Sequence, residues 1–199
     1  MLLAGLLAAA LLMPSSAGTD VVRVSPVDAD GTVKPAYTVA HHYGGARCQR
    51  PSASIGSAYR CFTQRAPGGV YDPCWVAETA EHVVCLTLPW KHGVVKLDVS
   101  GGYDDTEDFR HVAHPWGVRL ASGRHCLFQP GSTHSIDGRA VRYHCTKHVD
   151  LAGRFDRSRP QWRVRAYRDT TPHATDATYR YLGRARVTKA WFGEPSRPD

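Results

Sequence analysis

The sequence predicts an all-β, mainly antiparallel protein: a sandwich or barrel-like sheet held by three disulfides, with few short helices. In most segments the hydrophobic residues repeat with a period of two, which is typical of strands that bury one face. Turn-forming residues separate these segments, since the chain holds 18 Gly and 13 Pro. Six cysteines, an even number, favour a disulfide framework.

The first 17 residues resemble a secretory signal sequence. Residues 2–13 are apolar, a run too short to cross a bilayer as a helix, which needs about 20 residues. The small residues Ser15, Ser16 and Ala17 follow as a cleavage site. We therefore expect a secreted, extracellular protein, with an N-terminal core helix as the alternative. No later segment approaches transmembrane length, and we expect a monomer.

After residues 1–17 the chain divides into three predicted parts. Residues 18–45 are expected to form an N-terminal arm and the first strand, 46–193 the disulfide-stabilised β-domain, and 194–199 a C-terminal tail. The length of the mature chain fits one domain, or at most two small ones.

Strand patterns recur along the whole domain. In order, the predicted strands are 36–43, 57–63, 81–88, 93–100, 116–120, 124–129, 141–146, 161–167 and 179–191. In the segment QWRVRAY, the residues Trp162, Val164 and Ala166 share one face, and Arg163 and Arg165 share the other. The segment CWVAETAEH, residues 74–82, is the best short helix.

The cysteines are expected to pair in the order in which they occur. Six cysteines allow fifteen pairings, and spacing alone does not choose among them. Because the strands that flank each successive pair are close in sequence, we expect the pairs Cys48–Cys61, Cys74–Cys85 and Cys126–Cys145. Each closed loop of this size stabilises a fold by roughly 3 kcal/mol.

A zinc site is the competing interpretation of the cysteines. No C-x-x-C pair is present, although structural zinc sites usually present closely spaced ligands. Among eleven histidines, His111 with His114 and His144 with His148 have metal-compatible spacing, but strand geometry would place neither pair on one face at helical pitch, and no acidic third ligand is fixed nearby. We expect no metal and no cofactor.

Familiar catalytic motifs are missing from the sequence. It has no G-x-S-x-G elbow, no H-E-x-x-H and no phosphate-binding glycine loop. Ser132, His134 and Asp137 lie close together, but their stretch PGSTHSIDG is better interpreted as a turn. Carboxylates for glycoside hydrolysis would have to come from Asp72, Glu78, Glu81, Asp98 or residues 104–108. The last group, DDTED, is interpreted as an exposed loop rather than a calcium site.

Charge is unevenly distributed. Between Arg139 and Lys189 there are thirteen basic and four acidic residues, within a chain of 25 Lys and Arg and 18 Asp and Glu. This bias favours the binding of an anionic partner. The alternative interpretation is a solvated basic face that binds no partner. The candidate contact residues are Arg163, Arg165, Arg184 and Arg186. The five Trp residues are interpreted as core, with a sugar-stacking platform as the alternative.

The order of local patterns is distinctive. AYRCF, YDPCW and VVCLTLPW are followed by GRHCLFQPG, VRYHC, QWRVRAY and VTKAWFG. This order resembles an uncharacterised secreted cysteine-containing domain family of actinobacteria. The resemblance implies an extracytoplasmic, disulfide-bonded domain, and it assigns no catalytic or binding residues.

The sequence therefore predicts a non-catalytic binding module of the cell envelope or extracellular space. Its expected partners are anionic cell-envelope polymers or another extracellular protein, and no nucleic acid is expected. The alternative is a secreted hydrolase acting on cell-wall polysaccharide or peptide. A weaker alternative is a secreted inhibitor that presents the loop Gln64 to Tyr71.

Overall fold

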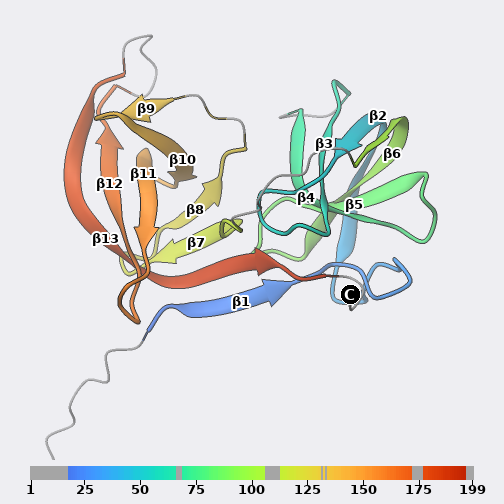
Figure 1. The fold of residues 1–199 in the computed structure, drawn as a ribbon, viewed down its shortest axis with the longest axis horizontal. Helices are drawn as coiled ribbons and strands as arrows, with labels where there is room; N and C mark the ends of the chain where they lie inside the picture. The colour runs from blue at the N-terminus through green and yellow to red at the C-terminus, as the bar shows by residue number, and fades with distance from the viewer. Residues whose placement is uncertain are drawn as a thin grey trace, which may run out of the picture.

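The computed structural model describes residues 18–65, 69–105, 113–130, 132, 134–171 and 177–195. Within these ranges the protein is all-β, as predicted, and its strands close into two barrels that lie side by side (Figure 1). The short helix predicted at 74–82 is wrong, because these residues finish one strand, turn, and begin the next strand of a hairpin. Among the described residues no helix has the length and apolar character to span a membrane.

The first barrel has five strands. They are β2 (Thr38–Gln49), β3 (Tyr59–Phe62), β4 (Val70–Val76), β5 (His82–Leu86) and β6 (Gly93–Asp104). Successive strands pair antiparallel, and β2 pairs with β6 in parallel to close the barrel. The interior is filled by alternate residues of these strands, among them Tyr59, Val83 and Leu97.

The second barrel has six strands. They are β7 (Gly117–Leu120), β8 (His125–Phe128), β10 (Arg139–Cys145), β11 (Val149–Asp156), β12 (Arg163–Asp169) and β13 (Tyr179–Gly193), and the short β9 (Ser135–Ile136) pairs with β10. All pairings around the ring are antiparallel, and β13 closes it against β7. Val118, Leu151 and Val164 are among the fully buried interior residues.

The N-terminal arm is built into the sheet instead of hanging loosely from it. Its strand β1 (Asp20–Val24) pairs in parallel with the C-terminal end of β13, from Lys189 to Gly193 (Figure 1). The predicted boundary between residues 45 and 46 falls inside β2, and residues 46–193 contribute to both barrels. Residue 194, assigned to the tail, is also part of the fold, because the carbonyl of Glu194 accepts a hydrogen bond from Trp75 Nε1 at 2.9 Å.

A shared core joins the two barrels. Trp75, Val84 and Val94 from the first barrel pack in one buried cluster with Trp116, which precedes β7. Next to this cluster, the Gly193 N–H donates to Ser54 Oγ at 2.8 Å. The tryptophans at strand parity are therefore mainly core, as the sequence indicated.

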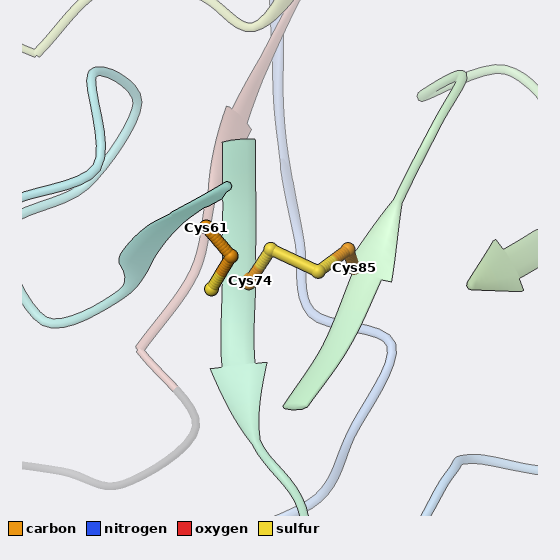
Figure 2. A group of neighbouring side chains, drawn as sticks. All are labelled: Cys61, Cys74 and Cys85. Carbon is orange, nitrogen blue, oxygen red and sulfur yellow. A yellow bond between two sulfur atoms is a disulfide. The ribbon is translucent and has the colours of Figure 1, made fainter. Parts of the chain in front are cut away.

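The three disulfides confirm the predicted sequential pairing. Cys48–Cys61 links β2 to β3, Cys74–Cys85 links β4 to β5, and Cys126–Cys145 links β8 to β10. Each joins residues that face each other on paired strands. The sulfur atoms of Cys61, Cys74 and Cys85 lie within 4.8 Å of one another (Figure 2), but each is already committed to a disulfide and is not a free metal ligand.

Strand β13 changes its inward-facing parity partway along. Val187 faces the interior, but the register shifts between Val187 and Lys189, so that Ala190 and Phe192 become the interior residues. Strict alternation would put Trp191 on the same face as Val187, but Trp191 instead packs against Trp90 with ring centroids 5.7 Å apart. A β-bulge is the physical reason, because one extra residue reverses the alternation beyond it.

Candidate functional site

The four arginines that the sequence singled out meet on the outside of the second barrel. Across the β12–β13 pair, Arg163 lies opposite Arg186 and Arg165 lies opposite Arg184. The residues between them, Val164 and Ala185, pack into the barrel interior. Because like charges directly opposite each other weaken strand pairing, this arrangement does not arise from the needs of the sheet alone.

The basic face continues onto β10 and β11. A shallow cavity of about 100 Å³ is lined by Arg139, Arg154, Arg163, Arg165 and Arg184. Within the described part of the chain, Asp156 is the one carboxylate in this lining, and its Oδ2 lies 3.3 Å from Arg184 Nη1. A hydrogen bond from the Ser158 hydroxyl, helped by the Ser158 N–H, lowers the pKa of Asp156, so this carboxylate is ionised at neutral pH.

A second, larger cavity adjoins the first and shares Arg139, Gly153 and Arg154 with it. Its volume is about 580 Å³, and the shared residues are joined in its lining by Arg142, Arg157, His114, Tyr143 and Phe155. Among the described residues that line it there is no carboxylate. The guanidinium of Arg157 is supported by Trp162, whose ring centroid lies 4.4 Å from Arg157 Cζ.

We call these residues together the arginine surface: Arg139, Arg142, Arg154, Arg157, Arg163, Arg165, Arg184 and Arg186. Guanidinium groups present forked donors that match phosphate, sulfate and carboxylate groups, and they keep their charge at every physiological pH. Grouping them around a concavity focuses the positive field on whatever enters it. The chemistry that this arrangement offers is the binding of anions.

Proton-transfer groups are scarce in the larger cavity. Burial raises the pKa of the Tyr143 hydroxyl, which donates to the Pro115 carbonyl at 2.7 Å and so has a structural task. The His114 ring stacks on Phe128 with centroids 5.5 Å apart.

Two of the three residues considered for a catalytic triad, His134 and Asp137, are engaged elsewhere. The His134 ring packs against Tyr179, with centroids 5.3 Å apart. Asp137 Oδ2 accepts a hydrogen bond from the Tyr167 hydroxyl at 3.0 Å. Asp137 also lies in the turn that links β9 to β10, as the sequence indicated for this stretch, which includes Ser132.

The candidate carboxylates have different surroundings. Asp72 is buried and receives hydrogen bonds from Ser52 Oγ, the Ala53 N–H and Arg60 Nε; burial raises its pKa, and these donors oppose the rise. Glu78 and Glu81 line a cavity of about 270 Å³ on the first barrel. Asp98 contacts two histidines, and residues 106–108 of the acidic run lie outside the described residues.

Of the two metal-compatible spacings identified in the sequence, the structure describes only His144 with His148 in full. His111 lies outside the described residues, and His144 Nδ1 pairs with Asp150 Oδ1. The structure instead brings together His42, His82 and Asp98, which are far apart in the sequence. Only the pairing of their strands reveals this cluster, so spacing along the chain gave no signal for it.

The loop proposed for an inhibitor, Gln64 to Tyr71, is described only in part, because residues 66–68 lie outside the described ranges. Four of its described residues line an open cavity with Gly45 and Phe62, namely Gln64, Arg65, Gly69 and Val70.

Comparison of the chain with protein-family models, with curated proteins and with solved structures found no match.

Proposed function

We propose that this protein is an extracytoplasmic binding module that holds anionic polymers of the cell envelope on its arginine surface. The observation that carries the proposal is the pairing of Arg163 with Arg186 and of Arg165 with Arg184 beside two arginine-lined cavities. A like-charged array of this kind lowers the stability of the sheet, and an anionic ligand reverses that penalty.

The two cavities suit a polymer better than a single small anion. They share Arg139 and Arg154, so adjacent anionic groups of one chain can occupy both. Phe155, in the lining of the larger cavity, adds an aromatic wall for the apolar part of a repeating unit.

Three disulfides support an extracytoplasmic location, because such bonds persist in oxidising compartments. The resemblance to secreted actinobacterial domains agrees with this placement. We propose a monomer that acts by binding alone, without a nucleic acid partner and without chemistry of its own.

Sedimentation with isolated cell walls tests the proposal. The variant Arg165→Glu/Arg184→Glu is expected to lose at least about 90% of wall binding, since a charge reversal replaces attraction by repulsion. The control Lys91→Glu/Arg119→Glu makes the same change in net charge outside the lining of either arginine cavity, and it should bind like the unmodified protein.

Two further comparisons sharpen the result. Binding should weaken as salt rises, because exposed charges are screened. Walls stripped of their anionic polymers should retain little protein. Full binding by Arg165→Glu/Arg184→Glu, or unchanged binding to stripped walls, would contradict the proposal.

A further inference from the structure

His42, His82 and Asp98 come from three adjacent strands of the first barrel. β6, which carries Asp98, lies between β2 with His42 and β5 with His82. His82 is directly opposite Asp98, and His42 is opposite Lys96, two residues before Asp98. Because their chain neighbours pack inside the barrel, the alternation of strands puts all three side chains on its outside.

The three side chains converge on one point. His42 Nε2 lies 2.5 Å from Asp98 Oδ1, and His82 Nδ1 lies 2.9 Å from the same oxygen. The two imidazole rings meet edge to face, with centroids 6.0 Å apart. One nitrogen from each ring and one carboxylate oxygen therefore lie within 4.8 Å of one another.

Hydrogen bonding within the cluster does not satisfy all of these atoms. His42 makes the hydrogen bond to Asp98, and this bond lowers the pKa of the Asp98 carboxyl. The Nδ1 atom of His82 is buried and lies 2.9 Å from the same carboxylate oxygen, so one oxygen faces a nitrogen of both rings. A buried nitrogen whose neighbouring oxygen already pairs with His42 has a poorly satisfied hydrogen bond, so its position needs a reason.

We propose that His42 Nε2, His82 Nδ1 and Asp98 Oδ1 form a binding site for a divalent transition-metal ion, with zinc the best fit. Two imidazole nitrogens and one carboxylate oxygen are a donor set that zinc accepts, with bonds of about 2.0–2.2 Å. The side chains of His42, His82 and Asp98 are 52%, 28% and 43% exposed, which leaves room for a water or another ligand at the fourth position.

Small side-chain movements suffice to admit the ion. Tetrahedral ligands at zinc are separated by about 3.3 Å, whereas these donor atoms are 2.5 and 2.9 Å apart without the ion. Rotation of the half-exposed His42 and Asp98 side chains widens the gap without moving the strands. The strands of the barrel thus hold the three ligands side by side, and rotation of the side chains adjusts the distances between the donor atoms.

The surrounding charges set the strength of binding. Arg65 lies beside Gly44, where an added methyl group would meet both its Nη1 and Asp98 Oδ2. Lys96 lines the adjacent cavity with Glu78 and Glu81. With one carboxylate in the site, Arg65 and Lys96 near it, and Glu78 and Glu81 in the adjacent cavity, we expect binding weaker than in closed structural zinc sites, which have four protein ligands. This site is independent of the arginine surface.

Zinc titration of the full chain, stripped of metal and free of any affinity tag, tests the proposal against a chromophoric chelator. We expect one zinc ion per chain. The variants His42→Ala, His82→Ala and Asp98→Asn should each weaken binding by at least about tenfold, because even the loss of a partner outside the ligands costs about 10- to 100-fold. His41→Ala is the matched control, since this neighbour stacks on Tyr43 instead of joining the cluster, and its affinity should be unchanged.

A second measurement needs no variant. Zinc added to the unmodified protein should shift the imidazole nitrogen resonances of His42 and His82, and leave those of His134 in place. Absence of zinc binding would overturn the proposal, as would equal weakening by His41→Ala and His42→Ala. If a variant fails to fold, the imidazole resonances of the unmodified protein decide the matter.

Discussion

Arg165 on β12 lies directly opposite Arg184 on β13, and both point away from the barrel interior. The pair Arg163–Arg186 stands two positions away on the same face. Each like-charged pair opposes strand pairing by up to about 1 kcal/mol. Asp156 reaches Arg184, at 3.3 Å, and offsets part of this repulsion. The arginine surface therefore lowers the stability of the folded protein.

Replacing one arginine of this array should stabilise the protein while it weakens anion binding. For Arg165→Glu we expect the free energy of unfolding to rise by about 0.5 kcal/mol, because a cross-strand repulsion becomes an attraction. Urea denaturation and wall binding, measured on the same preparations, check both effects. Arg119→Glu is the control, since Arg119 lies opposite Lys189 and its reversal relieves a like-charged pair outside the arginine cavities. A loss of stability in Arg165→Glu would contradict this account.

Close packing between the barrels should make Gly193 sensitive to a single methyl group. A Cβ at Gly193 would lie 2.6 Å from Ile55 Cγ2 and 3.2 Å from Ile55 Cβ. We expect Gly193→Ala to lower the free energy of unfolding by about 1–3 kcal/mol, as overpacking does in a close-packed core. Gly93→Ala is the control, because its nearest neighbour would be Ala40 Cβ at 3.9 Å. Thermal unfolding compares the two.

The same contact offers a rescue. Adding Ile55→Ala to Gly193→Ala removes the colliding atoms. The free energy of unfolding should therefore fall by less in the double variant than the sum of its decreases in the two single variants. Strict additivity would show that the barrels separate at this point in solution.

The sequence reveals what is local in this fold. Alternation placed Arg163 and Arg165 outside and Val164 inside, and the nearness of flanking strands gave the three disulfides. These features depend on residues that are close along the chain, where side-chain periodicity and loop length act directly.

The features that the sequence did not reveal depend on pairing between distant strands. The closure of the first barrel by β2 and β6, and the docking of β1 on β13, join segments that no periodicity links. The metal-compatible cluster of His42, His82 and Asp98 follows from the first of these pairings. The bulge that turns Trp191 away from the interior is invisible for a related reason, since it depends on the partner strand β7.

The three disulfides should differ in their resistance to reduction. Five of the six cysteines are fully buried, whereas Cys145 is partly exposed. Because a thiolate must reach a sulfur atom to break the bond, we expect Cys126–Cys145 to be reduced first under native conditions. Brief treatment with dithiothreitol, alkylation and peptide mass spectrometry identifies the first bond to open. Earlier alkylation of Cys48 or Cys74 would contradict the expected order.

Removing the disulfide Cys126–Cys145 should lower the free energy of unfolding markedly, even though this bond is the most accessible of the three. The double variant Cys126→Ala/Cys145→Ala releases a loop with a sequence separation of 19, for which the loss is about 3 kcal/mol. Urea denaturation of this variant measures the loss. A cost well below this value would show that the antiparallel β8–β10 pairing alone holds the two segments together.

The pairing of His144 with Asp150 should make stability depend on pH. Asp150 is buried, and the hydrogen bond from His144 Nδ1 to its carboxylate raises the pKa of His144. The folded protein therefore keeps the second ring proton of His144 to a higher pH than the unfolded chain does, in which imidazole has a pKa of about 6.5. The stabilisation is complete below the unfolded-state pKa and is lost as the pH rises through the folded-state pKa. Because the His144 side chain is about half exposed, we expect no more than about 1 kcal/mol.

The variant His144→Gln isolates this contribution. It should be less stable than the unmodified protein at about pH 5.5, where imidazole is charged, and the difference should vanish by about pH 9. Urea denaturation at both pH values measures it. His134→Gln is the matched control for the loss of an imidazole ring, because the His134 ring packs against Tyr179 and the change leaves the His144–Asp150 pair in place. A pH-independent difference for His144→Gln would show that the ring acts through packing and that its proton contributes nothing to the fold.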